Sequence, residues 1–258
     1  MKSIWTGAIG FGLVNIPVKL YSATQSSSLD LDMLDKKDHA NIQFRRVNER
    51  TGREVAWENI VKGYKINDRY VVLTDKDFET ANAIKTKLIE ISEFVKLSEI
   101  DIMYYEIPYY IVPEKSGIRA YALLREALFK TGKAAVASFV MRNKETLAVI
   151  RATEDVIVLN RIRFEQEIKD TRDLNLPKKI DIKPAELKMA IALIDQLSKK
   201  FNIRSYKDTY TEQLMKIIKA KSKGAKPAAP HLRIVHSKAG DLMSQLKESL
   251  RGKTKKAS

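Results

Sequence analysis

The stretch KKDHANIQFRRVNERTGREVAWENIVKGYKINDR, residues 36–69, sets the interpretation of the whole chain. Nine Lys and Arg stand against five Asp and Glu, so its net charge is +4. Apolar residues recur between the charges, and polar Asn48–Arg53, with Gly52 supplying a turn, interrupts them. This pattern predicts two short β-ribbons joined by a basic tip. Taken alone, it is more typical of a solvated hairpin face than of a binding surface.

The distribution of charge favours a binding surface. The 258 residues carry a net charge of +15, of which residues 216–258 contribute +10 and residues 36–69 contribute +4. The rest of the chain is therefore close to neutral. Two basic segments attached to a charge-balanced fold indicate a polyanionic partner, DNA or RNA, with an acidic membrane surface as the competing interpretation.

Several classes of protein are not expected. The sequence has no apolar run of about 18 residues, so no membrane span is predicted. The short, glycine-broken apolar run at the start does not resemble a secretory signal. There are no cysteines, which excludes disulfides and thiolate metal sites and fits a reducing compartment. Asp30, Asp32 and Asp35 lack the glycine and closing glutamate of a calcium loop, so we expect a solvated turn there and no metal.

Residues 4–21, IWTGAIGFGLVNIPVKLY, are typical of two strands. Pro17 predicts an edge or a bulge. Gly7, Gly10 and Gly12 have the spacing G-x-x-G-x-G, which is not the G-x-G-x-x-G of a dinucleotide loop. We expect these glycines where a barrel strand bends or lies close to another backbone.

The middle of the chain predicts further strands and one clear helix. Thr74 begins a Thr-x-x-Asp cap of a helical turn that runs to about Ala81. The helix has an apolar face of Tyr121, Leu124 and Leu128 and ends at Gly132. The tyrosines of the strand at 102–112 are interpreted as sheet packing, with base stacking as the alternative. The expected strands are 70–73, 88–95, 102–112, 135–141, 146–151 and 155–163, with a turn at 143–145, and the helix is 119–131.

The last third of the chain changes to a helical period. One helix is predicted from Pro184, with a stripe of Leu187, Ile191, Ile194 and Leu197, and a second from a Ser-x-x-Asp cap at Ser205 to Lys223. Residues 224–230 form a linker by composition. Asp241 is expected to cap a short amphipathic helix, ended by Gly252, with a leucine every turn. These leucines, which would dock a partner or fold back on the arm, are Leu242, Leu246 and Leu250.

No catalytic motif is present. The sequence contains no H-E-x-x-H, G-x-S-x-G or G-x-x-x-x-G-K-[ST] and no cysteine nucleophile. Dispersed carboxylates occur as in other proteins. We therefore expect no enzyme activity and no cofactor, with an enzyme acting on nucleic acid as the least favoured alternative.

Several segments in the same order resemble the bacterial Ku family, the DNA-end-binding proteins of non-homologous end joining. The resemblance covers nearly the whole chain. Many relatives carry a cysteine pair near Asn48–Gly52, where this chain reads NERTG, so no metal is expected to staple that hairpin. The segments that carry the resemblance are 4–21, 54–64 (EVAWENIVKGY), 70–79 (YVVLTDKDFE), 109–113, 142–151 (RNKETLAVIR), 186–197 (ELKMAIALIDQL), the 206–223 helix and 241–250 (DLMSQLKESL).

The resemblance implies a mixed, mainly β fold. Residues 1–180 would form a Ku-type β-barrel core with a DNA-encircling bridge at about 28–72. Residues 181–223 would form a helical arm, and residues 224–258 a flexible basic region with a short helix. It also implies a homodimer that forms a ring around double-stranded DNA ends and recruits an ATP-dependent ligase of the ligase D type. The expected DNA-binding residues are Lys36, Lys37, Arg45, Arg46, Arg50, Arg53 and Lys62.

Two functions follow from the sequence. The first is a non-catalytic clamp of the cytoplasm, associated with the nucleoid, that holds DNA ends for double-strand-break repair without reading bases. The second is a general nucleoid-associated or RNA-binding protein that binds through its basic tail. Both explain the charge of residues 216–258.

Overall fold

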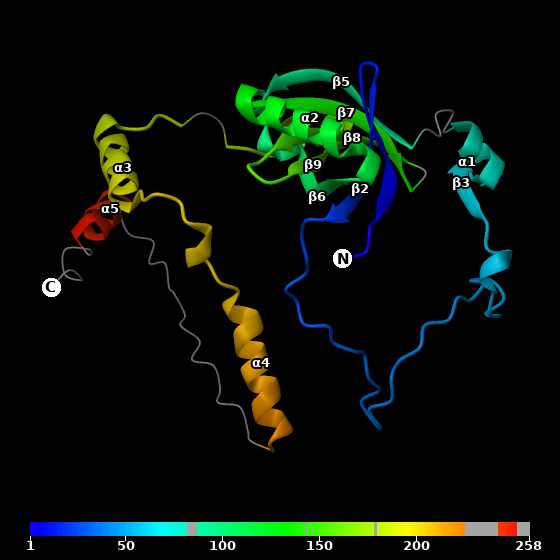
Figure 1. The fold of residues 1–258 in the computed structure, drawn as a ribbon. Coiled ribbons are helices and arrows are strands. Elements are labelled where there is room, and N and C mark those ends of the chain that lie inside the picture. The colour runs from blue at the N-terminus through cyan, green and yellow to red at the C-terminus, as the bar shows by residue number, and fades with distance from the viewer. Residues whose placement is uncertain (82–86, 143, 178–179, 225–241, 252–258) are drawn as a thin grey trace. The chain divides into compact units, whose positions relative to one another are not determined.

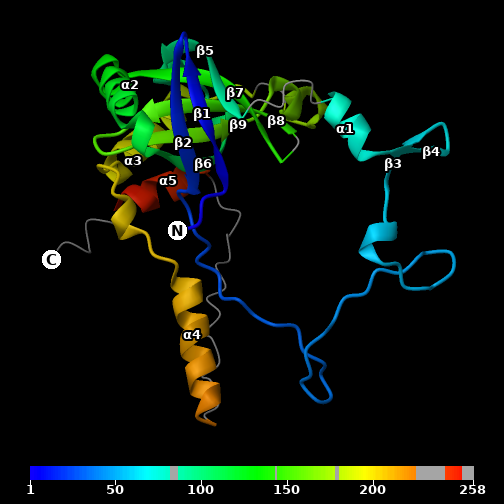
Figure 2. The same cartoon turned by 45° about the vertical axis from the view of Figure 1, so that its right-hand side comes forward.

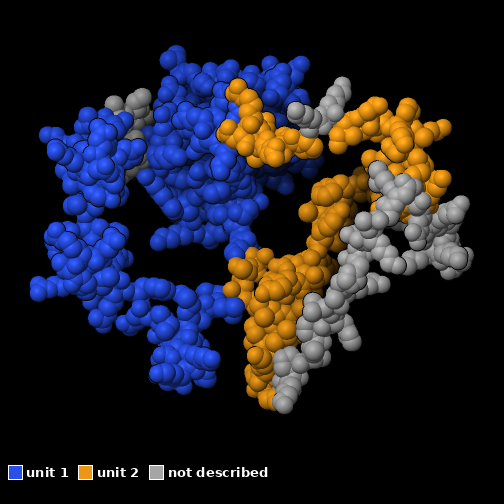
Figure 3. Space-filling view, turned by 180° about the vertical axis from the view of Figure 1, so that it is seen from behind, with its two compact units in different colours: residues 1–26, 30–170 blue, residues 27–29, 171–258 orange. Residues whose placement is uncertain are grey.

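The computed structural model describes residues 1–81, 87–142, 144–177, 180–224 and 242–251. The chain divides into two compact units, coloured separately in Figure 3. Unit 1 comprises residues 1–26 and 30–170, and unit 2 comprises residues 27–29 and 171–258. The domain boundaries expected from the sequence stay predictions.

Seven strands of unit 1 form a closed barrel in the order β1-β2-β6-β9-β8-β7-β5 (Figure 1). All neighbouring pairs are antiparallel except β1 and β5, which are parallel. The mainly β fold with a barrel core is confirmed. The barrel strands are β1 (Trp5–Phe11), β2 (Val14–Ser22), β5 (Leu88–Lys96), β6 (Tyr105–Pro113), β7 (Lys133–Met141), β8 (Lys144–Ala152) and β9 (Ile157–Ile162).

The parallel pairing of β1 with β5 closes the barrel at a glycine. The Ala8 N–H donates to the Lys87 carbonyl at 2.8 Å. A Cβ on Gly7 would collide with that same carbonyl and with the Trp5 ring. Trp5 in turn lies edge-on to Phe139, with ring centroids 5.7 Å apart, and donates its indole N–H to the Val140 carbonyl at 3.1 Å. Gly7 therefore lies close to another backbone, as predicted.

The barrel interior is apolar, and helix α2 (Ile118–Thr131) packs on the barrel (Figure 2). Tyr121, Leu124 and Leu128 are its buried face, and Gly132 ends it at φ 63°, so both predictions are confirmed. The buried Tyr121 hydroxyl donates to the Ile111 carbonyl and accepts from the Ile157 N–H, each at 2.9 Å. Burial raises the pKa of Tyr121, against the weaker opposite effect of the Ile157 hydrogen bond.

Two local predictions in the barrel are wrong. Pro17 does not mark an edge, because β2 lies between β1 and β6. Pairing between β2 and β6 ends at Val18, so no carbonyl of β6 requires a backbone N–H from residue 17. Proline, which lacks this N–H, is therefore tolerated there. Lys144 and Glu145 are not turn residues, since they already pair with Met141 and Val140 in the β7–β8 hairpin.

Residues 23–87 connect β2 to β5 and are called the bridge below; their described part lies outside the seven barrel strands. The end of β2 at Ser22 and the start of β5 at Leu88 flank β1. They are two strand spacings apart across the sheet and about five residues apart along it, which is about 20 Å. A handful of extended residues would span that distance. The bridge is therefore far longer than barrel closure requires.

The expected pair of ribbons around a basic tip is wrong in extent. Near the tip, strand-like pairing is limited to a single residue pair, Val47 with Glu54. Trp57–Asn59 is a 3-10 helix. The two-stranded sheet lies further on, between β3 (Lys62–Ile66) and β4 (Arg69–Leu73). Its turn is Asn67-Asp68, with φ of 45° and 64°, the backbone that Asn and Asp tolerate in two-residue hairpin loops.

Unit 2 contains three α-helices among its described residues: α3 (Pro184–Leu197), α4 (Thr209–Ser222) and α5 (Leu242–Arg251). Pro184 begins α3, as predicted, and α5 packs on α3 (Figures 1 and 2). The predicted cap at Ser205 is wrong. Asp208 caps α4, because its carboxylate accepts from the Thr211 N–H at 3.0 Å, whereas Ser205 lies in a 3-10 turn. Asp241 and Gly252 lie outside the described residues.

Closure at Gly7 generates a stability prediction. Gly7→Ala should lower the free energy of unfolding by about 1–3 kcal/mol, because the new Cβ has no room beside the Lys87 carbonyl. Gly63→Ala is the matched control, since a Cβ there meets its nearest atoms at 3.5 Å, an ordinary contact. Urea unfolding followed by circular dichroism measures both. Equal stability of the two variants would contradict the close approach of β1 and β5.

Candidate nucleic-acid interface

The bridge presents its predicted basic residues on two small loops and one strand. Lys36 and Lys37 lie in the first loop, where the Asp35 carboxylate accepts from the Lys37 N–H at 2.8 Å and the Asp35 N–H donates to the Ala40 carbonyl, also at 2.8 Å. Arg45, Arg46, Arg50 and Arg53 belong to the second loop, and Lys62 begins β3. All seven side chains are exposed.

The second loop is built by hydrogen bonds within the chain. Its flanks are tied by the Val55 N–H donating to the Arg46 carbonyl and the Asn48 N–H donating to the Arg53 carbonyl, both at 2.8 Å. Asn48 Oδ1 accepts from the N–H groups of Arg50 and Thr51 at 3.0 and 3.1 Å, an Asx turn. Gly52 then reverses the chain with φ of 66°. Four arginines are thereby brought onto one loop of about ten residues.

These arginines differ in whether their guanidinium groups already contact another side chain. Arg45 forms an ion pair with Glu54 at 3.2 Å, and the Arg46 guanidinium lies 4.5 Å from the centre of the Trp57 ring. Arg50 and Arg53 form no ion pair with the residues that the structure describes. A guanidinium stacked on an aromatic face keeps its edge free for a second anion. Arg46, Arg50 and Arg53 are therefore the loop cations most available to a phosphate.

Lys62 contacts helix α1 (Asp75–Ala81), which follows β4, through the ring of Phe78. Its ammonium lies 4.9 Å from the centre of the Phe78 ring. The start of α1 is fixed by the predicted cap, since the Thr74 hydroxyl donates to Asp77 Oδ2 at 2.6 Å and the Asp77 N–H donates to that hydroxyl at 3.3 Å. The Thr74 hydroxyl is the main cause of a lowered pKa of Asp77, so the cap stays charged near neutral pH.

The β3–β4 hairpin exposes apolar side chains that the sequence analysis did not assign to a function. Tyr64 and Tyr70 are 68% and 72% exposed, and Val71 and Val72 are about half exposed. Trp57 beside them in the chain is 69% exposed. Because paired residues share a face, Tyr64 and Val71 lie on one face of the hairpin and Tyr70 and Val72 on the other. A two-stranded hairpin of this composition is marginal on its own and is stabilised when its apolar side chains are covered. Residues 70–73 were expected as a strand, and the signal for its partner strand was Tyr64 and Ile66 alternating with Lys65.

The leucines of the predicted docking helix lie on α5. Leu246 and Leu250 are partly buried, and α5 packs on α3 within unit 2. The stripe of Leu187, Ile191, Ile194 and Leu197 on α3 stays at least half exposed. The structure shows α5 packed on the protein's own arm, and docking of these leucines on a partner stays a prediction; Leu242 is the first residue of α5.

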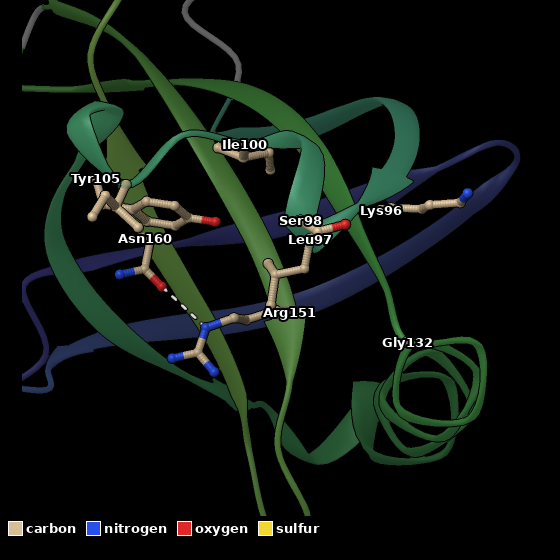
Figure 4. Close-up of a pocket in the computed structure, with 9 residues that line it drawn as sticks. Lys96, Leu97, Ser98, Ile100, Tyr105, Gly132, Arg151 and Asn160 are labelled. Atoms are coloured by element: carbon tan, nitrogen blue, oxygen red, sulfur yellow. Dashed lines mark hydrogen bonds between the residues drawn. The ribbon is translucent and has the colours of Figure 1, made fainter. Parts of the chain in front are cut away.

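A groove on the outside of the barrel, with a volume of about 930 Å³, lies under the segment that joins β5 to β6 (Figure 4). Its walls are mainly apolar, and the Arg151 Nε–H donates to Asn160 Oδ1 at 3.4 Å. Burial raises the pKa of Tyr105 further from neutrality, against the weaker effect of Arg151. The groove contains no carboxylate or histidine for acid–base catalysis among the described residues that line it. Across all the residues that the structure describes, no cluster of three His, Cys, Asp or Glu could hold a metal ion.

Comparison with known proteins agrees with this geometry. The family model described as the Ku70/Ku80 beta-barrel domain matches residues 10–189. The chain belongs to the Ku family. The match includes β2, the bridge and strands β5 to β9, so the exposed basic segment 36–69 of the bridge belongs to the Ku domain itself.

Curated Ku relatives match almost the whole chain. The chain is 42% identical to the non-homologous end joining protein Ku of Opitutus terrae, covering 97% of this chain and 91% of the relative. Identity is 37% with the Ku protein of Bacillus subtilis, covering 97% and 82% of the two chains. It is 34% with that of Mycobacterium tuberculosis, covering 99% and 97%. The solved SPOC domain of human PHD-finger protein 3 shares 11% identity at a TM-score of 0.31, covering 62% of this chain and 95% of that one, a likeness too low to carry an argument.

None of the helices in the described part of the chain is long and apolar enough to cross a membrane.

Proposed function

We propose that the protein is a non-catalytic, homodimeric clamp that binds double-stranded DNA ends in non-homologous end joining. The observation that carries this proposal is the exposed basic segment 36–69 of the bridge, with a net charge of +4, in a chain that belongs to the Ku family. The relatives it matches are named non-homologous end joining proteins. We place the protein in the cytoplasm, associated with the nucleoid.

The bridge supports binding without base recognition. Its cations are exposed on loops and a short strand, and none of those described is organised by a buried network that would fix a bidentate contact to a base edge. Lys and Arg of this kind bind phosphates of any sequence. Preference for ends would come from topology, since a closed ring can thread only onto DNA that has an end.

The exposed hairpin supports the homodimer. Tyr64, Tyr70, Val71 and Val72 would be covered by the bridge of a second copy, which would also close the ring. A hairpin that gains its stability from association stays open to DNA until the partner arrives. Dimerisation and encirclement would then be one event.

A competition assay tests the clamp. Labelled blunt duplex bound to the full chain should be displaced by unlabelled linear DNA, and much less by the same DNA covalently closed into a circle. Equal competition by both forms would overturn the clamp and favour the alternative, a general nucleoid- or RNA-binding protein driven by residues 224–258. Deleting those residues should leave the preference for linear DNA intact in a clamp and abolish nearly all binding in the alternative.

Charge reversal on the second loop tests the bridge. Arg46, Arg50 and Arg53 changed together to Glu should weaken DNA binding equally for all sequences. The slope of log affinity against log salt should also become shallower by about 0.9 for each phosphate that the variant no longer neutralises. The matched control reverses Lys96, Lys130 and Lys133, three exposed cations of the barrel region, and should bind more tightly than the bridge variant. Similar reductions in affinity in both triple variants would move the DNA channel away from the bridge.

We further propose that the C-terminal region recruits an ATP-dependent DNA ligase of the ligase D type. Leu246 and Leu250 are half-buried against the protein's own arm and are the expected anchors, with Leu242, in a partner's groove. Changing Leu246 and Leu250 to Ser should preserve DNA-end binding and reduce ligase stimulation. Changing exposed Gln245 and Lys247 of the same helix to Ser is the control. Full stimulation by the leucine variant would exclude α5 as the docking element.

A further inference from the structure

The open end of the barrel holds a basic pocket that the bridge does not use. Its volume is about 420 Å³, and its residues come from four barrel strands, the β7–β8 turn and the segment before β1. Three cations line it, and no acidic residue does among those described. The lining residues are Ile4, Ile107, Tyr109, Met141, Arg142, Lys144, Thr146 and Arg161.

The strand pattern directs Arg161 into this pocket. Ile157 and Leu159 belong to the barrel core, and side chains two residues apart on a strand share a face, so Arg161 continues the inward face of β9 to its end. On β8, Thr146 precedes the core residue Ala148 in the same way and is itself 7% exposed. The pocket is therefore the mouth of the barrel interior, where the apolar core gives way to cations.

The positive charge at the mouth exceeds its local neutralisation. Glu106 is shared by Arg161 at 2.8 Å and Arg163 at 3.1 Å. Lys144 contacts Glu167 at 3.4 Å, and the pKa of Glu167 is lowered, mainly by the Phe164 N–H. Two carboxylates, Glu106 and Glu167, are therefore available to neutralise four cations, namely the three of the pocket and Arg163.

Arg142 makes the excess larger. It forms no ion pair with the described residues. It lies in the β7–β8 turn with φ of 51°, a backbone conformation that residues other than Gly, Asn and Asp adopt rarely. Among the described side chains, Arg161 Nε is the buried nitrogen left without a hydrogen-bond partner. An additional acceptor at the mouth would reduce this imbalance.

The bridge begins and ends at the same end of the barrel. The register pairs Leu20 near the end of β2 with Trp5 at the start of β1, and β5 enters beside Ala8 at Leu88. β7 is antiparallel to β5, so it ends beside the start of β5, and β8 begins there as well because Met141 pairs with Lys144. Whatever the bridge holds is therefore tethered to the end of the barrel that carries the pocket.

We propose that this mouth binds a phosphate monoester. A terminal phosphate carries up to two negative charges and several acceptor oxygens, which suits convergent Arg and Lys side chains, whereas an internal phosphodiester is singly charged and flanked by sugars on both sides. The apolar wall of Ile4, Ile107 and Met141 would face the sugar or base behind the phosphate. Two sources share this chemistry, a phosphorylated DNA terminus, which rests on the proposed function, and a free nucleotide, which does not.

Calorimetry with small probes tests the pocket independently of DNA. The full chain should bind deoxyadenosine 5′-monophosphate and inorganic phosphate saturably, and deoxyadenosine far more weakly. The double variant Arg142→Gln with Lys144→Gln should bind the monophosphate about 100-fold more weakly or worse, the reduction expected for removal of two charge-assisted hydrogen bonds. The double variant Lys130→Gln with Lys133→Gln removes the same charge, including one cation in an ion pair, and should bind it as the unaltered chain does. Equal binding of nucleoside and nucleotide, or equal reductions in both double variants, would overturn the site.

Duplexes with and without 5′-phosphates separate the two sources. A DNA terminus is the source if the phosphate strengthens end binding by the unaltered chain and not by the Arg142/Lys144 variant. A free nucleotide is the source if the monophosphate binds and phosphorylation of the duplex has no effect. Absence of monophosphate binding with an intact preference for linear DNA would overturn the pocket alone. Absence of that preference with intact monophosphate binding would overturn the clamp alone.

Discussion

Parallel pairing between β1 and β5 is the constraint on which the rest of unit 1 depends. It completes the barrel, and it requires Gly7 because the Lys87 carbonyl and the Trp5 ring leave no room for a Cβ. The same pairing fixes the start of β5 on the far side of β1 from the end of β2, so both ends of the bridge are anchored to one rigid sheet. A clamp needs this arrangement, because a loop can enclose a ligand only if its two ends are held.

The bridge itself is organised on a different principle from the barrel. Its polar backbone groups are satisfied by short-range partners such as Asp35, Asn48 and Thr74, and its described residues bury almost no apolar side chain. Such a segment holds its local turns without a core, and its overall stability depends on what it binds. In the function proposed above, the exposed cations would bind phosphates and the exposed aromatic residues would be covered by a second copy of the chain.

Sequence patterns predicted the parts of the fold that repeat a period or follow a cap. The Tyr121, Leu124 and Leu128 face, the Thr74 cap and the close approach at Gly7 all follow from local rules. The order of strands around the barrel depends on pairings between distant residues, which a single sequence does not encode as a pattern. The hairpin turn at Asn67-Asp68 was not predicted, because Gly52 is the stronger turn signal in that stretch. The pocket was not predicted either, because Arg142 and Arg161 lie far apart in the chain and meet only when β8 and β9 pair.

Topological capture is the most direct test of the central claim that a closed ring, rooted in the barrel, holds DNA. The protein would be loaded on linear DNA, the DNA ends would be joined into a covalently closed circle, and the salt would then be raised to a level that removes contacts to phosphate. A ring should stay on the circle at high salt and leave only after the circle is cut. Release from the intact circle at the same salt as from linear DNA would contradict the account.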